Sequence, residues 1–275
     1  MRSSLRAGPI VSFALLVLLS GAVLSAQSTS ATTPPASQDQ ADGAPCDRLG
    51  FATVFTCPWH DLRNVVRGES LVWLGAGALL AGGSVMLDDE VRKAMTDTDP
   101  DQFLAAGRII GDVGVQFGLP ITLYAVARAT RHPGTADFAV TLLRTQVVNG
   151  ILTRSLKLIP RPRPYQEVAT LAYGSFPSGH TSAMFATATV VQRRWGWRGG
   201  LPAYLVATYV GASRLQNVHY LSDVAFGAAL GIAAGLVVNL PSRHAAISPI
   251  VAPGLTAVKI DINVSRSQWR STNHE

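Results

Sequence analysis

The sequence predicts an all-helical bundle of about six core helices, followed by a small C-terminal β-hairpin. Of the 275 residues, 48% are hydrophobic and only 15% are charged, against roughly 25% charged residues in ordinary soluble domains. The apolar residues also gather in stretches that are longer than strands and rich in alanine and leucine, which favours helix. These stretches are 71–87, 103–127, 138–159, 181–191, 201–215 and 224–240.

Helix-stop signals separate these stretches at Pro133-Gly134, at Gly199-Gly200 and at Pro241. Asp137 and Ser178 are placed as N-caps, because their short polar side chains can accept hydrogen bonds from free backbone amides.

Glycines recur every four residues in the last apolar stretch, at Gly227, Gly231 and Gly235. Residues at this spacing share one helix face, and a face of small residues lets helices approach closely.

The tail differs from the bundle. Two β-prone runs flank Pro253-Gly254, and polar and apolar residues alternate from residue 256 onward. This pattern predicts a hairpin within 246–275, for which the sequence suggests no function.

The N-terminus has the order of a secretory signal peptide: basic residues at 2–6, an apolar run over 10–24, and small residues before position 27. We expect a signal peptide over 1–26, with an uncleaved membrane anchor as the alternative. Residues 27–45 are polar and predict a flexible linker. The helical domain is therefore expected over 46–245, in an exported protein.

Cys46 and Cys57 are the only cysteines. In an exported chain, two neighbouring cysteines favour a local disulfide, and no third or fourth metal ligand lies near them in the sequence.

The net charge of +6 comes from scattered basic residues. This scatter argues against nucleic-acid binding and leaves an anionic substrate or an anionic membrane surface as partner.

Three clusters carry chemically active residues, and each lies at a predicted helix end, so they could meet at one end of the bundle. They are the segments 157–164, 177–180 and 213–223. Lysine and arginine in the first supply charge and forked donors that suit phosphate. Ser178 and Gly179 begin a helix, where free N–H groups favour an anion.

The third cluster pairs His219 with Asp223 four residues later, on one face if the segment is helical. A carboxylate there fixes the imidazole tautomer and raises its nucleophilicity, and His180 could then donate a proton to a leaving oxygen. Each cluster alone also has a structural explanation: a capping histidine, a stiff Arg-Pro loop, a surface His/Asp contact. Together and in this order they point to phosphate chemistry.

Taken together, the clusters resemble the type 2 phosphatidic acid phosphatase (PAP2) superfamily, which includes bacterial nonspecific acid phosphatases and vanadium haloperoxidases. The family pattern is Lys, six residues, Arg-Pro; then Pro-Ser-Gly-His; then Ser-Arg, five residues, His, three residues, Asp. Residues 177–180 match in full, and His219 and Asp223 have the family spacing. The resemblance covers roughly residues 100–240.

The chain departs from this pattern in two places. Five residues separate Lys157 from Arg163, whereas six separate Arg154 from Arg161. Lys157 with Arg163 is preferred for its sequence context, and Arg161 and Arg154 stay open as phosphate ligands. Only four residues lie between Arg214 and His219. One residue turns a helical side chain by about 100°, so a loop must absorb the difference.

The resemblance implies that His219 attacks phosphorus to form a phosphohistidine, that Asp223 orients the imidazole, and that His180 serves as acid and then as base. It also implies a set of groups that hold the phosphoryl oxygens. These groups are Lys157, Arg163, Ser178, the Gly179 amide and Arg214. Neither a cofactor nor a metal is implied, because the fixed cations supply the positive charge.

The sequence thus predicts a phosphatase acting on phosphate mono- or diphosphate esters, with a lipid-linked substrate favoured. A soluble periplasmic acid phosphatase on small esters, a vanadium haloperoxidase and a non-catalytic phosphate- or lipid-binding protein are the alternatives. The enzyme is expected in the periplasm or facing it at the membrane. Whether the bundle is soluble or embedded stays open, because the positive-inside rule and the signal peptide give opposite topologies.

Overall fold

The computed structural model describes residues 46, 50–96, 101–164, 174–215, 218–238, 246–252 and 255–261. The signal peptide predicted for 1–26, the linker predicted for 27–45 and the stop signal at Pro241 lie outside the described residues.

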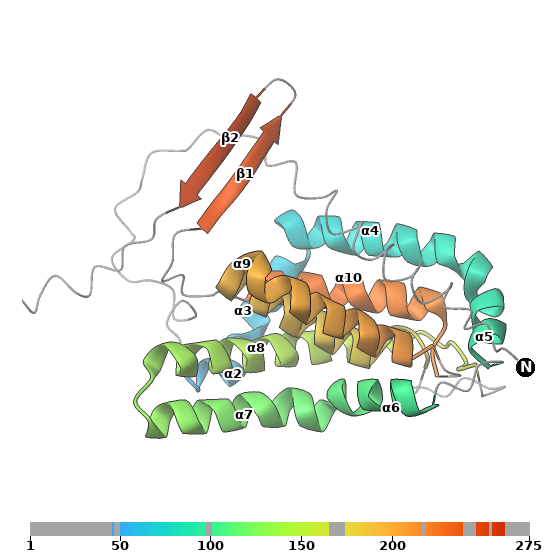
Figure 1. Cartoon of the computed structure of the whole chain (residues 1–275), viewed down its shortest axis with the longest axis horizontal. Helices are drawn as coiled ribbons and strands as arrows, with labels where there is room; N and C mark the ends of the chain where they lie inside the picture. The colour runs from blue at the N-terminus through green and yellow to red at the C-terminus, as the bar shows by residue number, and fades with distance from the viewer. Residues whose placement is uncertain are drawn as a thin grey trace, which may run out of the picture.

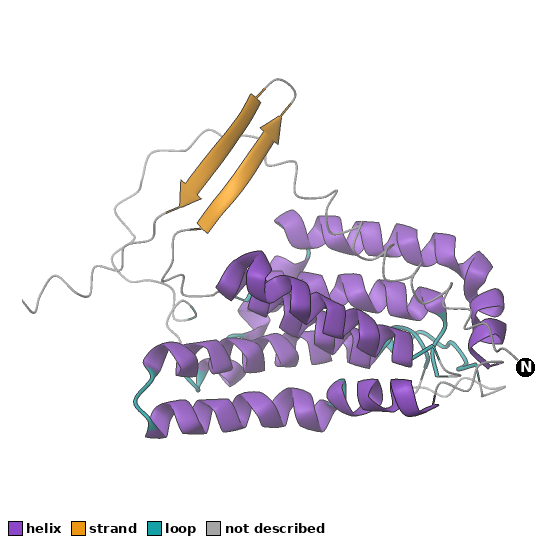
Figure 2. Ribbon diagram, viewed as in Figure 1, coloured by secondary structure: helices purple, strands orange, loops and turns teal. Residues whose placement is uncertain are grey.

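Helices form the described part of the bundle, as predicted (Figures 1 and 2). Two short helices come first, α2 (Thr53–Thr56) and α3 (Pro58–Val65). The later elements are α4 (Gly68–Ser84), η2 (Val85–Leu87), α5 (Asp88–Thr96), α6 (Asp101–Ile110), α7 (Val113–Ala129), α8 (Pro133–Leu156), α9 (Gly179–Ser213) and α10 (Leu221–Val237). Strands β1 (Ala246–Ala252) and β2 (Leu255–Asp261) pair antiparallel in the tail.

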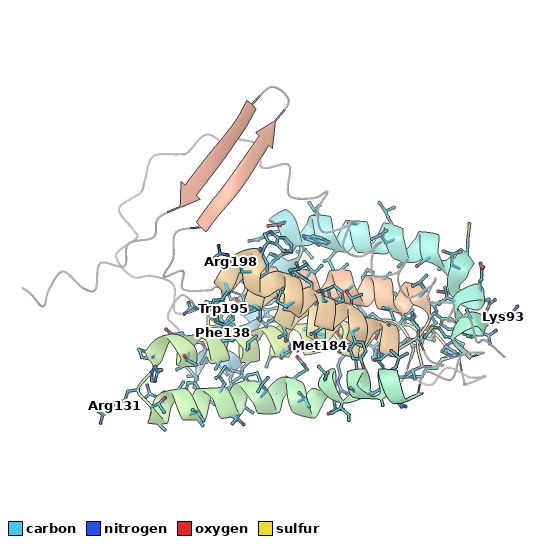
Figure 3. All side chains as sticks on the ribbon, viewed as in Figure 1. Lys93, Arg131, Phe138, Met184, Trp195 and Arg198 are labelled. Atoms are coloured by element: carbon cyan, nitrogen blue, oxygen red, sulfur yellow. A yellow bond between two sulfur atoms is a disulfide. The ribbon has the colours of Figure 1, made fainter. Side chains whose placement is uncertain are left out.

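The break expected at Gly199-Gly200 is wrong, because α9 turns back on itself at Gly196. There φ is 66° and ψ is −162°, a conformation that glycine adopts without steric cost. Gly200 instead allows the two arms of α9 to approach, since a Cβ at this position would lie 2.6 Å from the Cβ of Gln192. The aromatic rings of Phe138 and Trp195 pack at 4.6 Å beside this turn (Figure 3).

Two further predicted boundaries are wrong. Helix α8 begins at Pro133 rather than after Asp137, because proline lacks the N–H that is unsatisfied in a first turn. The stretch over 103–127 is two helices, α6 and α7, bent by 56°. Asp112 starts the second one by accepting a 2.7 Å hydrogen bond from the N–H of Gly114.

Helix α10 packs against α9 through the predicted glycine face. A Cβ at Gly227 would lie 2.8 Å from the carbonyl oxygen of Ser178, and one at Gly235 would lie 2.6 Å from the Cβ of Thr189. The backbones can therefore approach only where side chains are missing. This contact fixes the start of α9 against the start of α10.

Helices α4 and α7 carry much exposed apolar surface. Leu79 is 80% exposed and Leu119 is 66% exposed. In the described ranges, the continuous helical stretch Gly68–Met95 is long and apolar enough to cross a membrane, and the bent pair Leu104–Ile110 and Val113–Ala129 passes the same test jointly.

Candidate active site

The three predicted clusters meet at one end of the bundle, where α8 ends and both α9 and α10 begin (Figure 1). Lys157 is the C-cap of α8, Ser178 is the N-cap of α9, and His219 precedes Tyr220, the N-cap of α10. The Ser178 N–H donates to the backbone oxygen of Asp223 at 3.1 Å. That bond ties the second cluster directly to the third.

His219 and Asp223 face each other at the start of α10. The distance from His219 Nδ1 to Asp223 Oδ2 is 3.6 Å, and the two side chains are 3% and 0% exposed. His219 lies just outside the helix, so the condition for a shared helix face is not met. A capping box replaces that geometry, because Asp223 Oδ2 accepts the N–H of Tyr220 at 2.9 Å.

Burial controls the charge of both histidines. Removal from water lowers the pKa of His219 to about 4, and Asp223 opposes this shift while Lys157 and Arg163 add to it. Burial likewise lowers the pKa of His180 to about 4, with Arg214 and His219 contributing. Both imidazoles are therefore neutral at pH 7 in the free protein, and a neutral imidazole has the lone pair that a nucleophile needs.

The start of α9 offers a place for an anion. Ser178 is fully buried, and its Oγ accepts a hydrogen bond from Thr181 Oγ1 at 2.9 Å. Gly179 lies half-buried beside it, and an added Cβ would meet only Thr153 Cγ2, at 3.6 Å. Free N–H groups and the positive end of the helix dipole make such a helix start suitable for phosphate oxygens.

Lys157, Arg163 and Arg154 lie in different surroundings. Lys157 Nζ donates to the carbonyl oxygens of Gly174 at 2.9 Å and Pro177 at 3.1 Å, and burial, with Arg163 contributing, lowers its pKa to about 8. Arg163 acts electrostatically on Lys157 and on both histidines. Arg154 is exposed on the last turn of α8.

Arg214 ends α9 and is buried. Its carbonyl oxygen accepts the N–H of His219 at 3.0 Å, which ties the two residues together. Because Arg214 also acts electrostatically on His180, the four-residue spacing still keeps its charge beside the histidines.

Arg161, which the sequence leaves open as a phosphate ligand, contacts carboxylates in the structure. Its guanidinium donates to Asp223 Oδ1 at 2.6 Å, to Ser222 Oγ at 2.9 Å and to Asp88 Oδ2 at 2.7 Å. The guanidinium of Arg161 is thus engaged with two carboxylates and one serine hydroxyl. Sequence reasoning missed Asp88 entirely, because its only signal is an acidic first turn of α5, which many surface helices share.

Cys46 and Cys57 form a disulfide with a Cα–Cα distance of 5.6 Å. Beside it, Arg144 Nη1 donates to the Cys46 carbonyl oxygen at 3.1 Å. In the part of the chain that the structure describes, no three His, Cys, Asp or Glu side chains are grouped as ligands for a metal ion.

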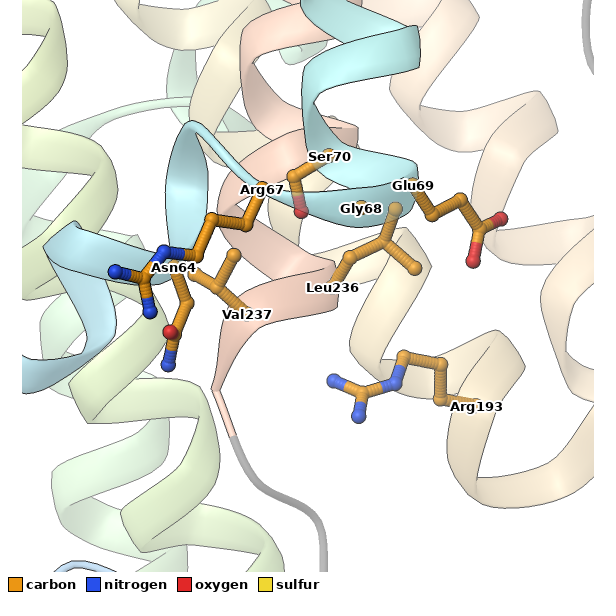
Figure 4. A pocket seen from close by; sticks show the side chains of 8 residues that line it. All are labelled: Asn64, Arg67, Gly68, Glu69, Ser70, Arg193, Leu236 and Val237. Atoms are coloured by element: carbon orange, nitrogen blue, oxygen red, sulfur yellow. The ribbon is translucent and has the colours of Figure 1, made fainter. Parts of the chain in front are cut away.

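A cavity of about 350 Å³ lies between the start of α4 and the end of α10 (Figure 4). Its lining comes from Asn64, Arg67, Gly68, Glu69, Ser70, Arg193, Leu236 and Val237. Arg193 donates to the carbonyl oxygens of Gly235 and Val238 at 2.6 and 2.7 Å, so it caps the end of α10. None of the residues of the three clusters lines this cavity.

Comparisons with known proteins agree with the motifs. The model of the PAP2 superfamily matches residues 134–245. A lipid A 1-phosphatase from Porphyromonas gingivalis is 44% identical over 68 residues, which are 23% of this chain and 15% of that protein. A decaprenylphosphoryl-5-phosphoribose phosphatase from Mycobacterium tuberculosis is 36% identical over 98 residues, which are 34% of this chain and 54% of that protein.

The matches to these curated relatives span about half of their length or less. A crystal structure of LpxE from Aquifex aeolicus matches with 27% identity and a TM-score of 0.46, over 55% of this chain and 94% of that one. The family match includes all three clusters, from Lys157 to Asp223, and leaves out Asp88. On its motifs and this match, the chain resembles the PAP2 superfamily over residues 134–245.

Proposed function

We propose that this protein is a metal-independent phosphatase that hydrolyses lipid-linked phosphate mono- or diphosphate esters through a phosphohistidine intermediate. The observation that carries the proposal is the buried His219–Asp223 pair at 3.6 Å, next to His180 and the N-terminus of α9. The pair supplies a nucleophile beside a carboxylate that can orient its imidazole, and the helix start supplies donors for phosphoryl oxygens.

In the first step, the lone pair of His219 Nε2 forms a bond to phosphorus while the bond to the leaving oxygen breaks. His180 gives its proton to that oxygen, and Asp223 holds the proton on His219 Nδ1. The negative charge of the bound phosphate raises the pKa of His180, which makes it a proton donor in the complex. In the second step, water attacks phosphorus, the P–N bond breaks, and His180 takes the proton from water.

The fixed cations stabilise the charge that spreads over the phosphoryl oxygens in both steps. Arg163 and Arg214 supply charge beside the histidines, and the Ser178 and Gly179 region supplies backbone donors. Lys157 contributes charge and also holds the loop before α9 through the carbonyl oxygens of Gly174 and Pro177.

An apolar rim beside the site supports a lipid substrate. Met86 is 90% exposed, Leu158 is 62% exposed and Ile159 is 47% exposed. Met86 precedes Asp88 and Ile159 precedes Arg161, and the Asp88–Arg161 bond brings these two segments together. By their names, the lipid A 1-phosphatase and the decaprenylphosphoryl-5-phosphoribose phosphatase act on lipid-linked phosphates. A rim of this kind fits an alkyl chain that stays in or near a bilayer.

We place the enzyme at the membrane, facing the periplasm, with a domain over 46–245 after a signal peptide and linker. The exposed apolar faces of α4 and α7 support contact with lipid. The Cys46–Cys57 disulfide supports an oxidising compartment.

The first experiment measures phosphate release in EDTA from a panel of lipid phosphates, lipid diphosphates and small phosphate esters. We expect release from lipid substrates that continues in EDTA and disappears in His219→Ala. His132→Ala is the matched control. His132 is exposed and lies just before α8 begins at Pro133, at the opposite end of this helix from Lys157. Absence of release from any substrate by folded protein would contradict the enzyme proposal. Preference for small esters would contradict the lipid substrate.

Rapid quenching tests the intermediate. Phosphorus-labelled substrate should leave an acid-labile, alkali-stable label on the wild type, as expected for a phosphoramidate. The label should be missing from His219→Ala. A label of different stability would rule out phosphohistidine.

A further inference from the structure

Asp88 is a buried carboxylate from outside the three clusters, at the start of α5. Its side chain is 7% exposed, and both of its oxygens have partners. Oδ1 accepts the backbone N–H of Ser222 at 2.9 Å, and Oδ2 accepts from Ser222 Oγ at 2.6 Å and from Arg161 Nη2 at 2.7 Å. Three charge-assisted bonds on one buried group fix its position strongly.

Arg161 connects Asp88 to the active site. One guanidinium nitrogen binds Asp88 and the other binds Asp223 at 2.6 Å. The fork of Arg161 therefore bridges two carboxylates, and its flat face lies 4.6 Å from the ring centre of Tyr220. A lysine could not make both contacts, because it presents a single nitrogen.

From these contacts we propose that Asp88 is a positioning residue for catalysis, acting through Arg161 and Ser222 on Asp223 and so on His219. The proposal rests on the phosphatase function given above. It assigns a role to a segment that precedes the part of the chain matched by the family model, 134–245.

Two effects follow from this arrangement. Asp88 neutralises part of the positive charge of Arg161. Arg161 therefore offsets less of the negative charge of Asp223, which can better stabilise the imidazolium of the phosphohistidine. Asp88 also binds the N–H of Ser222 at the start of α10, which holds the backbone that carries both His219 and Asp223. Neither effect touches the substrate, so the binding step is left unchanged.

The test compares Asp88→Asn with Asp89→Asn on the best substrate. Asp89 follows directly in the same helix turn, and its side chain is 79% exposed. We expect kcat to fall about 10-fold to 100-fold in Asp88→Asn, as for other outer partners of catalytic groups, with KM within about twofold. Asp89→Asn should behave as the wild type. An unchanged kcat in folded Asp88→Asn, or a rise in KM alone, would overturn the proposal.

A pH profile separates positioning from mere loss of folded protein. The charged and titratable groups that face His219 are Asp223, Lys157, Arg163 and His180. Removing the negative charge of Asp88 makes this environment more positive, so the acidic limb of kcat/KM should move to lower pH. An unmoved limb with reduced kcat would indicate a structural role and contradict the proposal.

A double-mutant cycle with Arg161→Met tests the route of the effect. Because Asp88 also acts through the Ser222 N–H, Asp88→Asn should still lower kcat in the Arg161→Met background, but by a clearly smaller factor than in the wild type. Full additivity would overturn the proposed route. If Asp88→Asn does not fold, Arg161→Lys replaces it, because it keeps the charge but loses the bridge.

The proposed function is tested separately, by EDTA-resistant release from the wild type and its loss in His219→Ala. Failure of the Asp88 proposal therefore leaves that result standing.

Discussion

His219 and His180 have the same physical situation at the scale of single residues. Each is removed from water and each faces fixed positive charge, from Lys157 and Arg163 for His219 and from Arg214 for His180. Burial and these cations together favour the neutral imidazole. The same surroundings that weaken the proton affinity of the histidines in the free enzyme also attract a phosphate, whose charge then reverses the effect on pKa.

This reversal predicts different pH profiles for the free and the bound enzyme. The basic limb of kcat reports the complex and should lie at higher pH than the basic limb of kcat/KM, which reports the free enzyme. After correction for ionisation of the substrate, the basic limb of kcat/KM should lie near the pKa of His180 in the free enzyme, about 4. The measurement is a pair of pH-rate profiles on one substrate. Coincident basic limbs would contradict the prediction.

At the scale of elements, the contact between α9 and α10 decides whether the site is assembled. The glycine face of α10 lies on the backbone of α9, and Gly227 meets Ser178, the N-cap of α9. The start of each helix is therefore held by the other. The Ser178 N–H also bonds the backbone oxygen of Asp223, so a small displacement here moves groups from two clusters.

Gly227→Ala tests this dependence. A Cβ 2.8 Å from the Ser178 carbonyl oxygen must push the two backbones apart, which costs about 1–3 kcal/mol and should lower kcat by more than tenfold. Gly75→Ala in α4 is the matched control, because its Cβ would meet nothing within 4 Å, and it should leave activity unchanged. Activity assays and thermal unfolding of both variants provide the check, and equal effects in the two would contradict the prediction.

At the scale of the whole molecule, a buried ion pair connects the first short helices to the bundle. Arg144 in the middle of α8 donates to both oxygens of Asp61 in α3 at 2.8 Å, and the two side chains are 0% and 1% exposed. Arg144 also reaches the Cys46 carbonyl oxygen. A charge buried this completely must keep its partner, so the segment around α2 and α3 is held against α8.

Asp61→Asn should lower the free energy of unfolding by about 3–5 kcal/mol, because it leaves the Arg144 charge uncompensated. Replacing both residues, as Asp61→Leu with Arg144→Met, should cost less than the single change. Lys157 lies 13 positions after Arg144, which is about 20 Å along the direction of α8. Because the ion pair is this far from the site, kcat per folded molecule should be unchanged. Chemical denaturation of both variants measures this, and a double variant less stable than the single one would count against the ion-pair argument.

The sequence predicted the helical class better than it predicted the path of the chain. Periodicity and composition are local signals, so the long apolar stretches were identified correctly as helices. The turn of α9 at Gly196 was missed. Gly199-Gly200 looks like a stop signal in sequence, yet its role comes from contact with Gln192 on the other arm, which no local pattern reveals.

By itself, the sequence determined which chemical groups are present: two histidines, Asp223, and cations spaced around helix ends, in an order that resembles one superfamily. Only the tertiary structure decided which groups work together. The sequence leaves Arg161 open as a phosphate ligand, and only the structure shows that it bonds Asp223, 62 residues away, and Asp88, 73 residues away. Such contacts depend on how helices pack against one another, and packing is set by the whole chain rather than by any segment of it.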